Sequence, residues 1–346
     1  MLRSVLFYHH GEIILRRIFC LLLLLLLLFS SGCNTDFTDQ PPISATFLQF
    51  DTSVTITLYA TKETTLSRDE LQECLEECRQ LCIKYEEIFS RTLENSEIYR
   101  MNHTYEAGVA YPLSSEAYEL LTYCHQYSRI TNGAFSPFLA PLTGLWDFAG
   151  SKVPPEAESL ASILPLLSHR DVLLKDGTIT FAKEGMGVDV GASAKGYIAD
   201  RLKEHLVAAG VTSGVISLGG NVLCIGEKPD GSPFRIGIQK PFGASQETAA
   251  VLDVRDRSVV SSGIYERYFM WEDRLYHHIL NPATGYPYDN ELLGVTILSD
   301  SSLQGDVLST SCFALGLEKG MELLAQYPEA EGIFITKDYE LHYTWK

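Results

Sequence analysis

The spacing of apolar residues predicts both strands and amphipathic helices in the first part of the chain. Apolar and polar side chains alternate over residues 46–60, which predicts a strand pair or one long strand. Ser67 and Glu70 form a capping-box pattern, which opens a helix expected to end near Phe89. A second amphipathic helix is expected over residues 116–130.

The rest of the chain has the pattern of short strands interrupted by isolated helices. Asp176 and Gly177 lie between alternating apolar residues, a strong hairpin signal. A helix that starts near Gly196 is expected to end near Ala209, with Gly210 as its cap. Strands are expected over residues 215–218, 234–239, 251–254, 268–277 and 293–298, followed by a helix over 306–327 and a hairpin over 333–343. This order favours an α+β fold, with residues 46–346 as one globular unit.

Residues 131–155 show little periodicity but carry many glycines, prolines and aromatic residues. A loop of this composition either plugs a core or lines a ligand cleft. The sequence leaves both interpretations open.

The first 32 residues have the pattern of an export signal. Arginines precede a leucine-rich apolar run over residues 18–29, which is shorter than the roughly 20 residues needed to span a bilayer. The run ends in two serines, a glycine and Cys33, which resembles a bacterial lipobox, although Ser30 replaces the usual branched residue. We expect residues 1–32 to be removed, Cys33 to be lipidated and residues 33–45 to form a polar tether. A plain signal peptide is the alternative.

The charge of the chain argues against nucleic acid as a partner. Lys and Arg number 27 against 44 Asp and Glu, so the formal net charge is −17. A net-acidic surface repels phosphate backbones.

Three cysteines, Cys74, Cys78 and Cys82, lie four residues apart on one face of the first predicted helix. Free cysteine behaves as a small apolar residue, so this spacing predicts core packing. A metal site is disfavoured, because no partner His or fourth Cys follows at short spacing.

Residues 188–197 are rich in small side chains and lie directly before a predicted helix. Small residues let the backbone approach a ligand, the start of a helix presents unpaired N–H groups to an anion, and Lys195 adds positive charge. This combination suits a phosphate or diphosphate, although it matches neither a Walker loop nor GxGxxG. A tight structural turn is the alternative.

Two further segments carry polar residues that suit catalysis or metal binding. His277 and His278 are neighbours on a predicted strand, so only one of them can face a given cleft, and a lone His is more often structural. Asp306, Ser309 and Thr310 follow spacings of three and four that put oxygen atoms on one helix face. Oxygen ligands suit Mg²⁺ or Ca²⁺. The alternative is that Asp306 caps the helix.

Taken together, these segments resemble the ApbE family, the FAD:protein FMN transferases. The resemblance covers about residues 47–343 and rests on six motifs that occur in the family's order. They are Gly133-Ala134-Phe135 with Pro137 and Leu145-Trp146-Asp147-Phe148; Asp189-Val190-Gly191-Ala192-Ser193-Ala194-Lys195-Gly196-Tyr197; Leu218-Gly219-Gly220-Asn221; Ser262-Gly263 with Tyr265-Glu266-Arg267; His278-Ile279-Leu280-Asn281-Pro282 with Thr284-Gly285; and Asp306 with Thr310. The family implies a T-fold-like α+β unit with a mostly antiparallel sheet, flanking helices and two lobes around a flavin cleft.

The resemblance also implies site residues. The FAD site would be lined by Ala134, Phe135, Ser136, Asp189, Lys195, His278 and Ile279. A Mg²⁺ ion would be held by the backbone oxygen of Ala192 and by Asp306, Ser309 and Thr310. We expect His278 to accept the proton of the attacking hydroxyl, because neutral imidazole suits that task near neutral pH.

Three positions depart from the family pattern. Thr92 stands where many members carry Tyr, Asn281 replaces a common Asp, and Ala283 replaces a common Lys or Arg. These differences bear on flavin affinity and on the balance between transfer and hydrolysis.

The activity that the resemblance implies is transfer of the FMN half of FAD, with Mg²⁺, to a Thr or Ser hydroxyl of a partner protein, with release of AMP. The partner would be a membrane electron-transfer subunit, and the enzyme would be anchored by its lipid to the outer face of the bacterial inner membrane. Two alternatives stay open: a Mg²⁺-dependent FAD pyrophosphatase, and a non-enzymatic flavin-binding lipoprotein.

Overall fold

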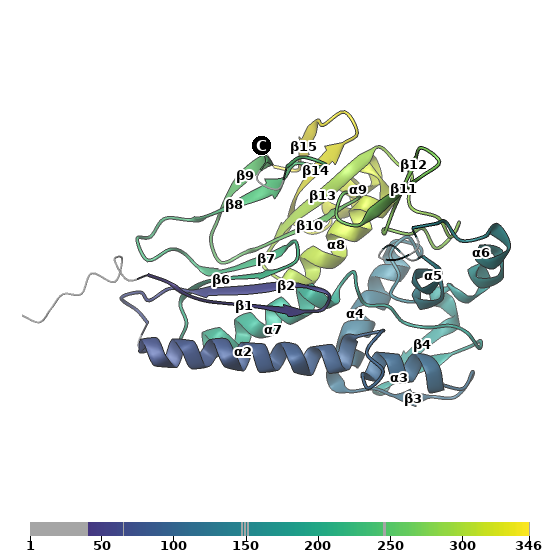
Figure 1. Ribbon diagram of the computed structural model, residues 1–346, viewed down its shortest axis with the longest axis horizontal. Coiled ribbons are helices and arrows are strands. Elements are labelled where there is room, and N and C mark those ends of the chain that lie inside the picture. The colour runs from purple at the N-terminus through teal and green to yellow at the C-terminus, as the bar shows by residue number, and fades with distance from the viewer. Residues whose placement is uncertain are drawn as a thin grey trace, which may run out of the picture. The chain divides into compact units, whose positions relative to one another are not determined.

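An eight-stranded antiparallel sheet runs through the computed structural model (Figure 1). In spatial order, its strands are β1 (Ile43–Gln49), β2 (Thr52–Leu58), β6 (Ser213–Leu218), β7 (Asn221–Gly226), β10 (Ser258–Gly263), β13 (Leu292–Ser299), β14 (Glu331–Thr336) and β15 (Leu341–Tyr343). The structure describes residues 41–64, 66–146, 148, 150, 152–244 and 247–345. The export signal, Cys33 and the first part of the tether lie outside these residues.

Four helices follow one another across the sheet, each in contact with the next. They are α2 (Arg68–Phe89), α7 (Ala194–Ala209), α8 (Ser302–Leu315) and α9 (Leu317–Leu324). α2 packs on β1, α7 on β6 and β7, α8 on β10 and β13, and α9 on β14. The predicted antiparallel α+β fold is confirmed.

The remaining elements form smaller groups. Three small sheets consist of β3 (Tyr111–Pro112), β5 (Thr178–Phe181) and β4 (Val172–Lys175); of β8 (Phe234–Gln239) and β9 (Thr248–Val254); and of β11 (Tyr268–Trp271) and β12 (Arg274–His277). The other helices are α3 (Glu97–Thr104), α4 (Ser115–Ile130), α5 (Ala140–Leu145) and α6 (Ala157–Ile163), with 3₁₀ turns at Leu164–Leu166 and His169–Asp171. Within the described part of the chain, no helix has the length and apolar character needed to cross a membrane.

Local signals predict the beginnings and ends of several elements correctly. Ser67 and Glu70 form both hydrogen bonds of a capping box at the start of α2. Asp176 and Gly177 adopt left-handed backbone angles (φ 50° and 76°) in the β4–β5 turn. Gly210 ends α7 with φ 103°, a conformation that glycine adopts without steric cost.

Other elements differ from the prediction. The single helix expected over residues 306–327 is two helices, α8 and α9, separated at Gly316 (φ 81°). β7 and β10 were not predicted; the serines and the glycine of β10 mask its strand pattern. The short helices α3 and α5 were also missed.

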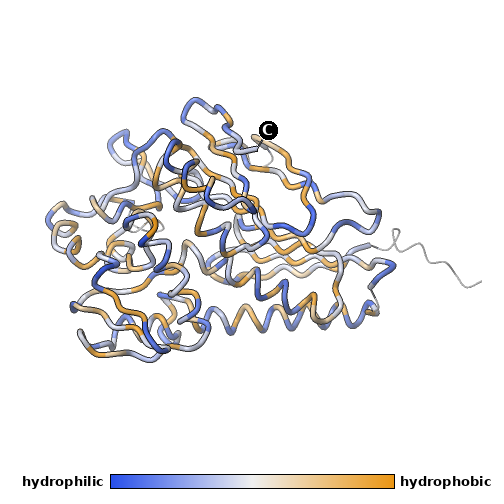
Figure 2. Tube along the Cα trace, turned by 180° about the vertical axis from the view of Figure 1, so that it is seen from behind, coloured by the Kyte–Doolittle hydropathy of each residue, from blue (hydrophilic) through white to orange (hydrophobic). Residues whose placement is uncertain are grey.

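The cysteine-bearing face of α2 is part of the main core, as predicted. Cys74, Cys78 and Cys82 are buried and form no disulfide. Burial raises the pKa of the Cys82 thiol to about 12, so the thiol stays protonated. Figure 2 shows the resulting pattern, with hydrophilic and hydrophobic residues alternating along α2 and hydrophobic stretches in the central strands.

Candidate active site

Asp306 is the buried acid of the candidate site. It is the fifth residue of α8, whose N-cap is Ser301, so the alternative that Asp306 caps the helix is wrong. Its side chain is 3% exposed, and its Oδ2 accepts a hydrogen bond from the backbone N–H of Gly196 at 2.9 Å. Burial raises the pKa of Asp306, while the charge of Lys195 opposes this rise. No Lys, Arg or His among the described residues forms an ion pair with it.

The start of α7 reaches Asp306 because Gly196 has no side chain. A Cβ atom at Gly196 would lie 2.4 Å from the backbone oxygen of Ser302 and 2.8 Å from the Cβ of Asp306. Gly196 is therefore needed for the contact between α7 and α8. Asp200, one turn further along α7, accepts hydrogen bonds from the backbone N–H groups of Ser302 and Leu303.

Three hydroxyl groups lie in contact on α8 and β10. Ser262 Oγ is hydrogen-bonded to Ser309 Oγ at 2.8 Å and to Thr310 Oγ1 at 3.1 Å. Ser309 Oγ also donates to the backbone oxygen of Asp306 at 3.0 Å. The structure thus brings Asp306, Ser309 and Thr310 together, and it adds Ser262, to which sequence reasoning gave no role.

The chemistry of these groups fits Mg²⁺, which prefers oxygen ligands. Asp306 is a buried carboxylate without a basic partner, and the Ala192 carbonyl accepts no hydrogen bond from the described backbone. No group of three or more His, Cys, Asp or Glu suited to a metal occurs in the described part of the chain, so a transition-metal cluster has no support there. The assignment of Ala192, Asp306, Ser309 and Thr310 as ligands stays a prediction.

Asp189 connects the small-residue loop to two other segments. Its backbone N–H donates to the oxygen of Pro137 at 2.7 Å, and its Oδ1 accepts from the N–H of Gly191 at 2.9 Å. Its Oδ2 forms an ion pair with Arg91 Nε at 2.9 Å. Arg91 therefore holds exposed Thr92, one of the departures from the family pattern, beside this loop.

The segment 134–136 is anchored by its neighbours. Phe135 is 2% exposed and belongs to the main core, so its side chain packs inside rather than on a surface. Ser136 Oγ accepts from the N–H of Phe138, and Tyr288 Oη donates to the oxygen of Ala134 at 2.9 Å. Within this segment, Phe135 and Ser136 are buried, whereas Ala134 is half-buried.

The positive charge of Lys195 acts on ionisable groups of other segments. Its Nζ donates to the backbone oxygen of Gly191 at 3.3 Å. Burial raises the pKa values of Asp306 and Glu266 and lowers that of His278; the charge of Lys195 opposes the two rises and adds to the fall.

His278 follows directly after β12 and is held by Arg267. Its backbone N–H and its ring Nδ1 both bond to the backbone oxygen of Arg267, at 3.1 and 3.2 Å. A carbonyl oxygen only accepts, so Nδ1 carries the proton and Nε2 of the neutral ring is left as a base. Burial, with the charge of Arg267, lowers the pKa of His278 to about 3, so the ring is neutral near pH 7.

His277 lies in a different environment, as strand alternation predicts. It is 4% exposed, its Nε2 is bonded to the backbone oxygen of Tyr288 at 2.8 Å, and its ring packs against Phe313. Burial lowers the pKa of His277 to about 4. These contacts make His277 a structural residue. Ile279, one residue beyond His278, is also buried.

Comparisons with known proteins identify the family of this chain. A family model described as the ApbE family matches residues 50–334. The chain belongs to the ApbE family. It is 37% identical, over 76% of its length and 82% of the relative's, to an FAD:protein FMN transferase of Klebsiella pneumoniae (strain 342). It is 33% identical, over 78% of each chain, to one of Treponema pallidum (strain Nichols).

Solved structures of ApbE proteins have the same fold. The ApbE protein from Thermotoga maritima matches with a TM-score of 0.78 and 26% identity, covering 88% of this chain and 97% of that one. The apo form of the Pseudomonas stutzeri flavinyl transferase ApbE matches with a TM-score of 0.76 and 27% identity, covering 88% and 95%.

Two motifs of the ApbE resemblance have structural roles that the sequence did not resolve. In the aromatic loop, Trp146 is 3% exposed and its Nε1 donates to the oxygen of Gly285 at 2.8 Å. It packs with Phe269 and Tyr276 in a second, smaller core, so this part of the loop plugs a core.

Glu266 was missed as a candidate for a functional role in this ApbE site. A hypothetical Cβ at Gly220 would lie 3.6 Å from its Oε1, so Glu266 faces the Leu218–Asn221 turn motif. Desolvation by the surrounding chain, opposed by the charges of Lys195 and Arg267, raises the pKa of Glu266 to about 7, although the residue is exposed at the surface. In the sequence, the one indication of a functional role for Glu266 was its position between Tyr265 and Arg267 in a family motif.

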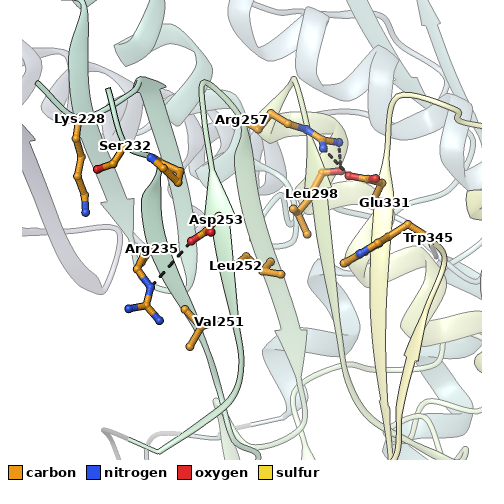
Figure 3. A pocket seen from close by; sticks show the side chains of 11 residues that line it. Lys228, Ser232, Arg235, Val251, Leu252, Asp253, Arg257, Leu298, Glu331 and Trp345 are labelled. Atoms are coloured by element: carbon orange, nitrogen blue, oxygen red, sulfur yellow. Dashed lines mark hydrogen bonds and ion pairs between the residues drawn. The ribbon is translucent and has the colours of Figure 1, made fainter. Parts of the chain in front are cut away.

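One hollow of the described chain is lined by other residues. It has a volume of about 630 Å³ and is lined by residues of β8, β9 and the C-terminal strands (Figure 3). Arg235 forms an ion pair with Asp253 there, and Arg257 forms one with Glu331. None of the residues predicted for the ApbE site lines it.

Proposed function

We infer that this chain transfers the FMN half of FAD to a Thr or Ser hydroxyl of an acceptor protein and releases AMP. The relatives are FAD:protein FMN transferases by name. The observation that carries the proposal is the contact of α7 with α8, in which the N–H of Gly196, next to Lys195, donates to Oδ2 of buried Asp306 at 2.9 Å. His278, whose ring Nδ1 is held by the Arg267 oxygen, is the proposed base. Diphosphate cleavage needs charge neutralisation and a proton acceptor, and these groups supply both.

The residues of the chain have distinct roles in this reaction. Lys195 attracts the diphosphate, and Asp189 orients the loop that precedes it through its bonds to Gly191 and Arg91. The acceptor oxygen forms a bond to the phosphorus of the FMN half, and the bond from this phosphorus to the bridging oxygen breaks. AMP leaves with the bridging oxygen, and the hydroxyl proton passes to Nε2 of His278.

The reaction is proposed to depend on Mg²⁺ held by Ala192, Asp306, Ser309 and Thr310. Bound there, the ion would neutralise charge on the diphosphate. Asp306 is the one carboxylate of this set, and its burial without a basic partner supports the assignment.

The place of the reaction is part of the proposal. Residues 1–32 would direct export, and a lipid on Cys33 would hold the enzyme at the outer face of the inner membrane. The acceptor is then a protein at the same surface, and the family resemblance implies a membrane electron-transfer subunit.

One experiment separates this function from its two alternatives. The purified enzyme is incubated with FAD and Mg²⁺, with and without membranes of the source bacterium, and protein-bound flavin fluorescence and free AMP are measured. AMP with a flavin-labelled protein supports transfer. AMP and free FMN in both samples would identify a pyrophosphatase, and bound FAD without turnover would identify a flavin-binding protein. The labelled protein is then purified as the acceptor.

A further inference from the structure

Exposed apolar side chains gather beside the candidate active site. Phe242, Tyr268, Met270 and Tyr339 are 41%, 40%, 56% and 47% exposed. They are four of the fourteen large apolar side chains that the described residues expose. We call these four residues the aromatic patch. Scattered exposed apolar residues are normal, but a contiguous group marks an interaction surface.

One ring contact and one hydrogen bond connect parts of the aromatic patch. The ring of Phe242 packs edge-on against Tyr268, with centroids 5.3 Å apart, and against Tyr265 at 6.3 Å. Tyr339 Oη donates to the oxygen of Pro241, next to Phe242, at 3.3 Å. Met270 lies two residues after Tyr268 on β11, so both point to the same side of the strand.

Folding does not require this face of β11 to be apolar. The strand already buries its other face through Phe269, which is 4% exposed and packs against Trp146 and Tyr276. An antiparallel hairpin of this kind usually presents polar residues on the opposite side. Here Tyr268 and Met270 occupy those positions and remain exposed.

The aromatic patch is continuous with the active-site segments. β11 begins two residues after Glu266 and directly after Arg267, whose backbone oxygen holds His278. Tyr268 pairs with His277 across the hairpin. Tyr265, beneath Phe242, lies so close to Gly263 on β10 that a Cβ there would be 2.3 Å from its ring. A polypeptide that covers the patch would therefore reach the segment that carries Glu266 and His278.

We propose that the aromatic patch is the docking surface for the acceptor polypeptide, which binds through apolar side chains that flank its target Thr or Ser. This inference rests on the proposed function, because only a transferase needs a second, macromolecular substrate at the site. FAD occupies the polar groups around Lys195 and Asp306, whereas the aromatic patch offers apolar area and little charge to a partner. Central aromatic anchors of this kind carry much of the binding energy in protein interfaces.

The test compares two double variants of the enzyme, with the flavin-labelled protein identified in the membrane experiment as the acceptor. Phe242→Ser with Met270→Ser removes two patch side chains that belong neither to the core nor to the proposed flavin and metal groups. Leu173→Ser with Val207→Ser is the control, since these side chains are 56% and 49% exposed on β4 and α7. Transfer rates are measured against acceptor concentration, and FAD affinity and water-dependent AMP release are measured without acceptor.

We expect the patch variant to raise the KM for the acceptor at least about tenfold, with FAD affinity and AMP release unchanged, while the control behaves as wild type. An unchanged KM for the acceptor would overturn the docking proposal, and so would an equal loss of FAD affinity, which would assign the patch to the flavin. If wild-type enzyme labels no protein, the proposed function itself fails, and the docking inference fails with it.

Discussion

His278 is the residue at which binding and chemistry can be separated. Its Nδ1–H is fixed on the Arg267 oxygen, which leaves Nε2 as the basic nitrogen. His278→Asn keeps a polar side chain and removes the base, so FAD affinity should change little while the transfer rate falls by roughly a hundred- to ten-thousandfold. Flavin-fluorescence titration and single-turnover transfer measure the two quantities.

His277 is the matched control for this variant. Its bonds to Tyr288 and its contact with Phe313 direct it into the core. His277→Asn should therefore change neither quantity much. A weaker FAD affinity in His278→Asn with normal turnover at saturating FAD would mean that His278 holds the flavin nucleotide instead.

Asp306 should be indispensable for turnover and dispensable for the fold. Asp306→Ala removes the one carboxylate proposed to hold Mg²⁺, so turnover at saturating Mg²⁺ should fall at least about a hundredfold. The circular dichroism spectrum should change little, because Ser301 caps α8 and Asp306 does not. Undiminished activity would reject the metal assignment.

The buried imidazole of His277 should make the protein sensitive to acid. Its pKa is lowered from 6.5 to about 4 in the fold, so the unfolded chain binds the proton first as the pH falls. The stability that neutral His277 contributes is present above pH 6.5 and is lost toward pH 4, at up to about 1.4 kcal/mol per pH unit. His277→Gln should flatten the fall of Tm between pH 7 and pH 4.5. The same change at exposed His103 should leave that fall as in wild type.

At the scale of elements, the contact between α7 and α8 positions the site. Gly196 lets the start of α7 lie against Ser302 and Asp306. Gly196→Ala should destabilise the fold by about 1–3 kcal/mol, because the new methyl group meets backbone atoms that cannot rotate away. Turnover should fall as well, since the contact places Asp306. Thermal unfolding and steady-state rates check both effects.

Gly144 provides the control for that substitution. It lies in α5, and a Cβ there would meet nothing within 4 Å. Gly144→Ala should leave stability unchanged or raise it slightly, because alanine is the better helix former. Equal losses of stability in the two variants would show that helix packing at Gly196 is not the cause.

The elements that the sequence predicted well are those with local signals. The capping box of α2 and Gly210 at the end of α7 need no information from the rest of the chain. β10 and β7 depend on pairing with distant strands, since β10 is held between β7 and β13. The serines and the glycine of β10 fit there because neighbouring elements pack closely, which no local pattern reveals.

The residues of the candidate site also divide into those with a signal in the sequence and those that depend on contacts between distant segments. Lys195, Asp306 and His278 could be named because each lies in a motif of the family resemblance. Ser262 and Glu266 could be placed in the site only from the structure, in which Ser262 contacts Ser309 of α8 and Glu266 lies near Gly220. Phe135 is buried in the core, and its proposed contact with the flavin stays a prediction.

At the scale of the whole molecule, the prediction that matters most concerns the anchor. Under the proposed function, a tether to the surface that carries the acceptor would raise the effective concentration of the enzyme there. Cys33 follows a short leucine core, and a lipid there would leave residues 34–42 between the membrane and β1. Cys33→Ser should therefore move the protein from the membrane fraction to a soluble or unprocessed form.

The same variant distinguishes loss of the anchor from loss of catalysis. Because Cys33 precedes the first strand, purified Cys33→Ser enzyme should release AMP from FAD in detergent-free solution at the wild-type rate. In cells, flavin labelling of the acceptor should fall, since the enzyme no longer shares its surface. Fractionation followed by mass spectrometry of the first peptide measures this directly. A variant that stays membrane-bound and is cleaved at the same position would show that residues other than Cys33 hold the protein at the membrane.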